Sequence, residues 1–223
     1  MVLPEYEKIA NCLPSLDRSA PANINLIEES AATGEVAALY DHFRAQFGRP
    51  DVPGILKCFA THPPLLKHMM DLSEQLIFAH GSLGRKHKEM IATLVSAQNS
   101  CPYCADSHGY FLRVHGGSSR ALAVIQANNL RSPELSIAEQ ALLEFARKVN
   151  FNSHEIVRGD VDLLLQAGWS ELQIAEAVHV AALFSTFNRV ANAFGLASQG
   201  LLSLCDEDAG DQRSDEASKR SSQ

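Results

Sequence analysis

The chain has 223 residues, of which 46% are hydrophobic, 20% charged and only 7% aromatic, enough for a single core, so we expect one domain. The longest apolar runs are a few residues, far short of the roughly 18 that a membrane-spanning helix needs. With 19 basic and 26 acidic residues the net charge is −7, which argues against nucleic acid as a partner.

The two ends of the chain differ in composition from the middle. Residues 1–32 contain three prolines between short apolar pieces, which predicts an arm packed on the body. Their first turn is acidic and lacks the apolar core of a secretory signal, so we expect a soluble, cytoplasmic protein. Residues 205–223 have six acidic and three basic residues and almost nothing apolar, which predicts a disordered acidic tail. Residues 33–200 are expected to form the helical domain.

Apolar residues recur at helical spacing through most of this middle region. A stripe from Val36 to Phe47 with Gly48 after it predicts a helix over about 34–47. Pro63 and Pro64 can open the next helix, whose apolar residues repeat every three or four positions and which can end at Gly81.

The same spacing continues to the end of the domain. Met90 to Val95 forms a third apolar stripe, and Ser136 and Ser170 each begin a capping-box pattern, the second before a long helix running to about Gly195. Alternating strand patterns and tight hairpin turns are absent from the sequence. The pattern therefore predicts an all-α fold, a bundle of several helices.

The stretch from Ser100 to His108 carries the chemistry. It places the thiols of Cys101 and Cys104 three residues apart and the imidazole of His108 four residues further on, so that on a helix all three nearly share one face. Ser100 or Cys101 can cap a helix, and Pro102 is tolerated in its first turn, so a helix is expected to start here. Both sulfurs then lie near the positive end of a helix.

A helix terminus alone does not activate a thiol. A free thiol with a pKa near 8.5 is only about 3% thiolate at pH 7, and only the thiolate attacks. The helix dipole contributes roughly 0.3–1 kcal/mol, less than the 1.4 kcal/mol or so that one pKa unit requires. His108, one turn after Cys104, is suited to take the thiol proton. Glu89, twelve residues before Cys101, could orient that imidazole if the two helices pack together.

The pattern Glu89-x11-Cys101-x2-Cys104-x3-His108 resembles the signature of the alkylhydroperoxidase D-like branch of the carboxymuconolactone decarboxylase superfamily. The resemblance extends over roughly residues 33–200. It includes the Ser82-Leu83-Gly84-Arg85 lead-in, the Ser136 capping box, Gly168-Trp169-Ser170 and the stretch from Phe187 to Gly195. It implies an all-helical fold that assembles into trimers or hexamers, and an antioxidant thiol peroxidase cycle on hydrogen peroxide or organic hydroperoxides.

Carried over to this sequence, the resemblance makes Cys104 the thiolate that attacks the peroxide and Cys101 the resolving thiol. His108 and Glu89 become a proton relay, and a lipoyl-bearing or thioredoxin-like dithiol protein becomes the reductant. Neither a cofactor nor a metal ion is expected. One position departs from the best-studied members, which have histidine between the two cysteines: here it is Tyr103, which does not exchange protons near pH 7 as imidazole does.

The sequence leaves open which of the two cysteines attacks and what the pair is for. The physics of a helix start makes the first cysteine, Cys101, the more acidic one, whereas the resemblance assigns the attack to Cys104. A buried, inert pair, a zinc site and a glutaredoxin-like motif are the alternatives, although a zinc site wants a fourth ligand and a glutaredoxin needs a strand before the motif. A decarboxylase acting on a lactone, or a redox sensor without turnover, are the alternative functions.

Other polar residues of the last predicted helix have structural readings. We expect Asn188 and Arg189 to satisfy buried carbonyls or to form a subunit contact rather than to do chemistry. His179 is expected in the core or at an interface.

Overall fold

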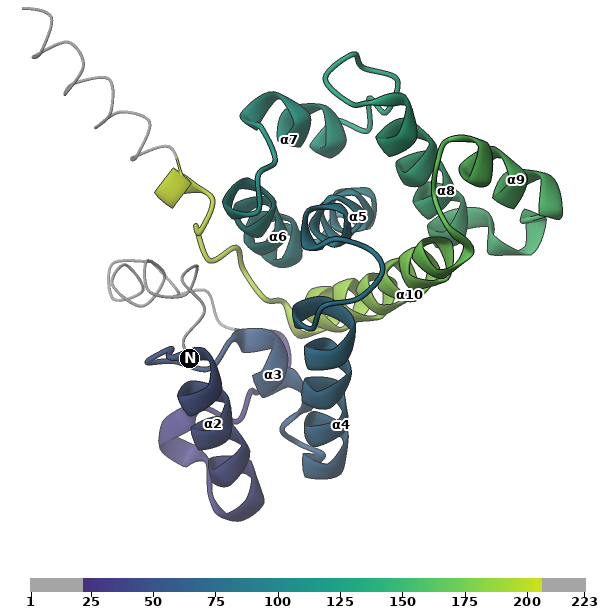
Figure 1. Ribbon diagram of the computed structural model, residues 1–223. Coiled ribbons are helices and arrows are strands. Elements are labelled where there is room, and N and C mark those ends of the chain that lie inside the picture. Colours follow the sequence, from purple (N-terminus) through teal and green to yellow (C-terminus); the bar gives the residue numbers. More distant parts are fainter. Residues whose placement is uncertain (1–21, 206–223) are drawn as a thin grey trace, which may run out of the picture.

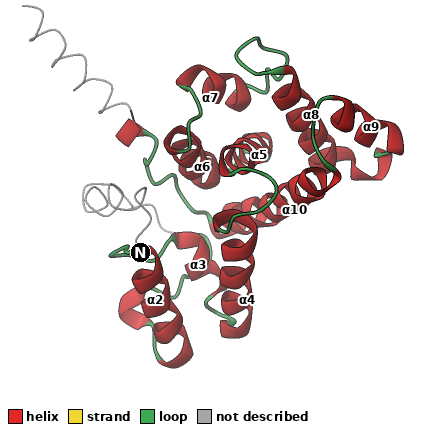
Figure 2. Ribbon diagram, in the orientation of Figure 1, coloured by secondary structure: helices red, strands yellow, loops and turns green. Residues whose placement is uncertain are grey.

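The computed structural model describes residues 22–205, and over these residues the chain is built from helices and loops with no strand (Figure 1, Figure 2). The predicted all-α class is therefore confirmed. The helices are α2 (Gly34–Phe47), α3 (Gly54–Phe59), α4 (Pro63–Ser73), α5 (Arg85–Gln98), α6 (Pro102–Val114), α7 (Ser119–Gln126), α8 (Ile137–Asn152), α9 (Arg158–Gln166) and α10 (Glu171–Phe194). Short 3₁₀ turns lie at Glu29–Ala31 and Ser153–Glu155.

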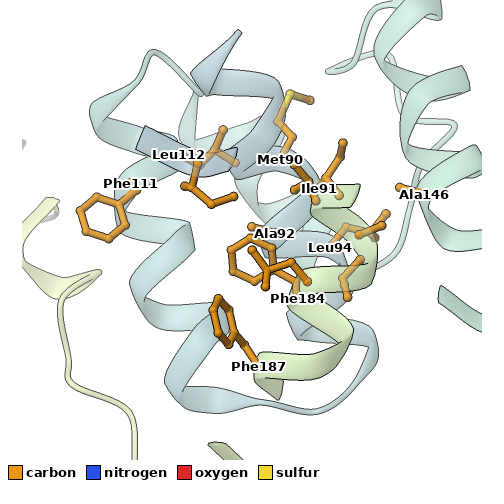
Figure 3. Packing of buried hydrophobic residues seen from close by; sticks show 14 of the residues in the cluster. Met90, Ile91, Ala92, Leu94, Phe111, Leu112, Ala146, Phe184 and Phe187 are labelled. Atoms are coloured by element: carbon orange, nitrogen blue, oxygen red, sulfur yellow. The ribbon is translucent and has the colours of Figure 1, made fainter. Parts of the chain in front are cut away.

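Helix α5 is the central helix of the larger of two helix groups, in which it packs against α6, α7, α8 and α10 (Figure 1). Its residues from 88 to 96 are all buried, because helices surround it on every side. Figure 3 shows Met90, Ile91 and Leu94 of α5 beside Phe184 of α10 and Leu112 of α6. Such a core is stabilised mainly by removing apolar surface from water, about 25 cal/mol for each Å².

Helices α2, α3 and α4 form a smaller group next to α10 (Figure 1). The predicted second helix ends earlier than Gly81, because α4 stops at Ser73 and a π-helical turn, Glu74–Phe78, follows it. The buried side chain of Lys88 holds this turn against α5: its Nζ donates to the carbonyl of Leu76 at 2.7 Å. Wider turns of this kind often occur where a helix borders a functional site.

The sequence patterns locate the longer helices well. The expected helix at 34–47 is confirmed in full as α2, the two capping boxes open α8 and α10 as expected, and α10 ends at a left-handed Gly195. The short helices α3, α7 and α9 were not predicted, since six to nine residues leave too few turns for a clear apolar stripe.

Both ends of the described region contact the body. In the predicted arm, the backbone N–H of Asn23 donates to Phe194 at 2.7 Å, and residues 1–21 lie outside the described region. At the other end the packed chain continues past residue 200, because Leu201 and Leu204 are buried and Asp106 accepts the backbone N–H of Leu201 at 2.9 Å. The predicted tail lies outside the described region beyond residue 205. Within residues 22–205, no helix is long and apolar enough to cross a membrane.

Candidate active site

All four residues singled out in the sequence come together where α5 meets α6. Glu89 lies on α5, Cys101 is the residue before α6, and Cys104 and His108 follow on α6. The two helices are joined by a tight reversal in which Ser100 has a left-handed backbone, with φ of 49°. Because the helices run back along each other from this reversal, Glu89 and His108 reach the same level.

The start of α6 positions both sulfurs. Cys101 has an extended backbone and stands at the cap, and Pro102 occupies the first helical position, where a backbone N–H would have no partner in the helix. Cys104 then lies in the first turn and His108 one turn beyond it. The predicted helix start is confirmed, and it places both thiols at the positive end of the helix dipole.

Glu89 is a fully buried carboxylate held between two cationic or polar partners. Its Oε2 lies 2.7 Å from His108 Nδ1, and its Oε1 accepts from Arg85 Nε at 2.6 Å. Burial alone raises the pKa of Glu89, but His108 and Arg85 outweigh that effect, and the net pKa is lowered. The carboxylate is thus charged at neutral pH.

The charged carboxylate determines the proton positions on His108. A carboxylate only accepts hydrogen bonds, so the imidazole places a hydrogen on Nδ1, and in the neutral ring Nε2 is left as an acceptor. The ring is held edge-on against Phe184, with centroids 4.3 Å apart. His108 is therefore oriented as a base.

The two thiols form a coupled pair. A hydrogen bond from Cys104, helped by the backbone N–H groups of Cys104 and Tyr103, lowers the pKa of Cys101 to about 7 against the opposing effect of burial. The same hydrogen bond between the two thiols, together with burial, raises the pKa of Cys104. The first ionisation belongs to the pair, and its charge rests on Cys101, as helix-start physics predicts.

Access to ligands favours the other sulfur. A cavity of about 120 Å³ has both Cys104 and His108 in its wall, whereas Cys101 does not border it. A ligand in this cavity meets the sulfur of Cys104 beside the imidazole. The wall is otherwise mainly apolar and includes phenylalanines from α2, the π-helical turn, α6 and α10: Phe43, Phe47, Phe78, Phe111, Phe184 and Phe187.

Asn188 is a residue of the site whose contact with the two sulfurs the sequence did not predict. It is fully buried on α10, its amide lies 2.9 Å from the Ser96 hydroxyl, and it hydrogen-bonds both sulfurs and lowers the pKa of each. Turned over, the same amide donates to the Phe184 carbonyl at 2.9 Å and accepts from Ser96. In this orientation Asn188 satisfies buried carbonyls, as the sequence predicted. Arg189, by contrast, is exposed and bonds its own helix at Ser185.

Arg85 is a second residue that the sequence reasoning did not place at the site. It stands four residues before Glu89, the spacing at which side chains of a helix meet, and this spacing could have identified it. Its guanidinium lies 4.7 Å from the ring centre of Phe78, a wall residue of the cavity. His179, expected in the core or at an interface, is exposed in this chain.

The alternative of a metal site finds no support in the side-chain geometry. Over residues 22–205 no three His, Cys, Asp or Glu side chains are arranged to hold a metal ion. Cys101 and Cys104 are both free thiols, as is Cys58.

The chain is similar to one family model and to two known proteins. Residues 63–148 match the carboxymuconolactone decarboxylase family. An alkyl hydroperoxide reductase of Mycobacterium tuberculosis is 34% identical over 106 residues, which cover 46% of this chain and 30% of that relative, so the match spans less than a third of that relative's length. An uncharacterized protein of Bacillus subtilis is 26% identical over 136 residues, covering 60% of this chain and 88% of that relative.

Solved structures share the fold. An uncharacterized peroxidase-related protein of Ralstonia eutropha, described as an alkylhydroperoxidase core, superposes with a TM-score of 0.72 at 24% identity, covering 82% of this chain and 95% of that one. A peroxidase-related protein of Silicibacter sp. gives 0.68 at 26% identity, covering 81% and 94%. A debrominase solved with 2,3,4-tribromopyrrole gives 0.66 at 17% identity, covering 86% and 99%, and so shares the fold.

Proposed function

This chain belongs to the carboxymuconolactone decarboxylase superfamily, in its alkylhydroperoxidase D-like part, and we propose that it is a thiol-dependent peroxidase that reduces hydrogen peroxide or organic hydroperoxides. Membership of this family supports a general antioxidant role like that of the alkylhydroperoxidases. One observation carries the finer proposal: Cys104 and His108 border the same cavity, and the buried Glu89 carboxylate lies 2.7 Å from Nδ1 of that histidine and orients it.

The first step oxidises Cys104. Its proton passes to His108 Nε2, and the resulting Cys104 thiolate attacks the nearer peroxide oxygen. The oxygen–oxygen bond breaks, Cys104 becomes a sulfenic acid, and the leaving oxygen takes a proton and departs as water or an alcohol. Two electrons move from sulfur to the peroxide. The Glu89 carboxylate stabilises the imidazolium while His108 holds the proton.

The second step forms the disulfide. The Cys101 thiolate attacks the sulfur of the Cys104 sulfenic acid, the sulfur–oxygen bond breaks, and the hydroxide that leaves takes a proton and departs as water. A dithiol protein, lipoyl-bearing or thioredoxin-like, then reduces the disulfide by thiol exchange and is itself oxidised. We propose that the protein works in the cytoplasm as a homo-oligomer, a trimer or hexamer.

A dithiol-dependent peroxidase assay tests the proposal. Wild type is expected to consume hydroperoxide through many turnovers with a reduced dithiol present. Cys104→Ser should abolish consumption, and Cys101→Ser should allow one sulfenic acid per chain, which a dimedone-type probe traps on Cys104. Cys205→Ser, outside the site, serves as the control and should behave as wild type.

Three outcomes would refute the proposal or its roles. A single stoichiometric oxidation of wild type that then stops indicates a redox sensor. Trapping of the sulfenic acid on Cys101 in the Cys104→Ser variant reverses the two roles. Unchanged turnover in both Cys101→Ser and Cys104→Ser would show that the thiols take no part in the reaction. It would favour the alternative of a decarboxylase, whose reaction needs no dithiol.

A further inference from the structure

Tyr103 stands between the two cysteines, and its buried side chain borders the cavity. The ring packs with Cys101, Cys104 and Ala191 in a small cluster of buried side chains. The side chain is only 6% exposed, and it borders the cavity together with Cys104. The residue that departs from the family pattern is therefore part of the ligand site.

The hydroxyl oxygen of Tyr103 already accepts two hydrogen bonds. The backbone N–H of Ile55 donates to it at 3.3 Å, and Nε2 of Gln199 donates to it at 3.2 Å. A phenolic oxygen has two lone pairs and one hydrogen, so both of its accepting positions are occupied. What remains of its hydrogen-bonding capacity is its own O–H.

That O–H has no acceptor among residues 22–205. A buried donor left without an acceptor costs free energy, and native proteins rarely contain one without a reason. Ile55 and Gln199 border the cavity as well, so the hydroxyl that they fix is at the cavity wall. An oxygen atom of a bound ligand would complete its hydrogen bonding.

We propose that the Tyr103 hydroxyl donates a hydrogen bond to the leaving oxygen of the hydroperoxide, a step that rests on the peroxidase function proposed above. When the Cys104 thiolate attacks, the electron pair of the oxygen–oxygen bond moves onto the leaving oxygen. A fixed donor aimed at that oxygen stabilises the transition state more than the ground state. Tyr103 keeps its proton throughout, and the proton that completes the alcohol or water comes from His108.

A phenol is suited to this task at this position. Burial raises the pKa of Tyr103 well above its usual value, so the hydroxyl stays neutral over the whole range in which the thiols ionise. A histidine here would change between donor and acceptor states near neutral pH. Tyrosine therefore provides a donor that does not depend on pH, and proton transfer is left to His108.

Tyr103→Phe tests the proposal, with Tyr40→Phe as a matched control. Tyr40 is also buried and donates its hydroxyl to the carbonyl of Ile27 at 2.8 Å, but it lies outside the cavity wall. In single-turnover mixing with an organic hydroperoxide, Tyr103→Phe is expected to oxidise Cys104 about 10- to 100-fold more slowly, whereas Tyr40→Phe matches wild type. Thermal unfolding of both variants checks that they fold.

A second readout separates a donor to the substrate from a structural role. Alkylation of the thiols by iodoacetamide over a range of pH needs the thiolate but no leaving oxygen in the cavity. We expect the alkylation rate and its pH profile to be the same in Tyr103→Phe and wild type. An equal loss in alkylation and in peroxide oxidation would overturn the proposal, because Tyr103 would then act through the thiols.

A gentler change covers the case in which Tyr103→Phe fails to fold. Monofluorotyrosine in place of Tyr103 keeps the ring and the two accepted hydrogen bonds but makes the O–H a stronger donor. It should speed the peroxide step, and an unchanged or slower step overturns the proposal. Wild type that consumes no hydroperoxide refutes the peroxidase function as well. Active wild type with an equally active Tyr103→Phe refutes only the role of Tyr103.

Discussion

Replacing Glu89 by glutamine keeps the shape of the buried side chain and removes its charge. The carboxamide oxygen can still accept from Arg85, but the carboxamide nitrogen now faces His108 Nδ1 and donates to it. The hydrogen of the neutral imidazole then moves to Nε2, the atom that should take the proton from Cys104. We expect the peroxide step to slow by about 10²- to 10⁴-fold, the range for a misoriented general base.

The same substitution has a calculable effect on stability. Both hydrogen bonds of residue 89 remain but lose the carboxylate charge, a difference of about 1 kcal/mol or more for each, and Arg85 loses a buried counter-charge. A loss of about 2–3 kcal/mol lowers the Tm of a chain of this size by about 4–12 °C. Glu35→Gln, an exposed change on α2, should leave both rate and Tm as in wild type.

The stability difference between wild type and Glu89→Gln should also depend on pH. Because the pKa of Glu89 is lowered in the folded protein, its carboxylate stabilises the fold above the ordinary carboxyl range, and this contribution disappears as the pH falls through the lowered pKa. Denaturant unfolding should show the gap closing below about pH 4. A folded Glu89→Gln variant that oxidises Cys104 as fast as wild type would refute the relay.

Three further substitutions test other parts of the structure. Lys88→Met should lower the free energy of unfolding by about 3 kcal/mol, because it leaves the buried partners of Lys88 unpaired. Lys67→Met breaks an exposed ion pair and should lower it by less than about 0.5 kcal/mol. Equal losses for the two variants in urea unfolding would contradict this. Asn188→Ala should raise the pKa of both thiols, as followed by thiolate absorbance, and unchanged titration would show that its amide does not act on the sulfurs. Cys104→Ala should raise the pKa of Cys101 from about 7, because the sulfur loses its main hydrogen-bond donor, and a titration that stays near 7 would contradict the coupling.

Helical class and the start of the site helix follow from local patterns. The apolar spacing of α2, the capping boxes at Ser136 and Ser170, and Pro102 after Cys101 each depend on residues within one or two turns, so the sequence is enough to predict them. The π-helical turn after Ser73 was not predictable in this way. It is held by Lys88, a residue from the next helix, whose side chain reaches back to the turn.

By itself, the sequence determined that two thiols and an imidazole share the first turns of one helix, because that arrangement depends only on spacing along the chain. Only the tertiary structure decided which groups surround them. Glu89 could orient His108 only if the two helices packed together, and the fold brings them together and buries the carboxylate. Asn188 reaches the sulfurs from a helix almost ninety residues away, and Gln199 and Ile55 fix the Tyr103 hydroxyl from two other segments. The physical reason is that burial, a shifted pKa and a directed hydrogen bond are produced by neighbours that packing brings together, and no local spacing encodes them.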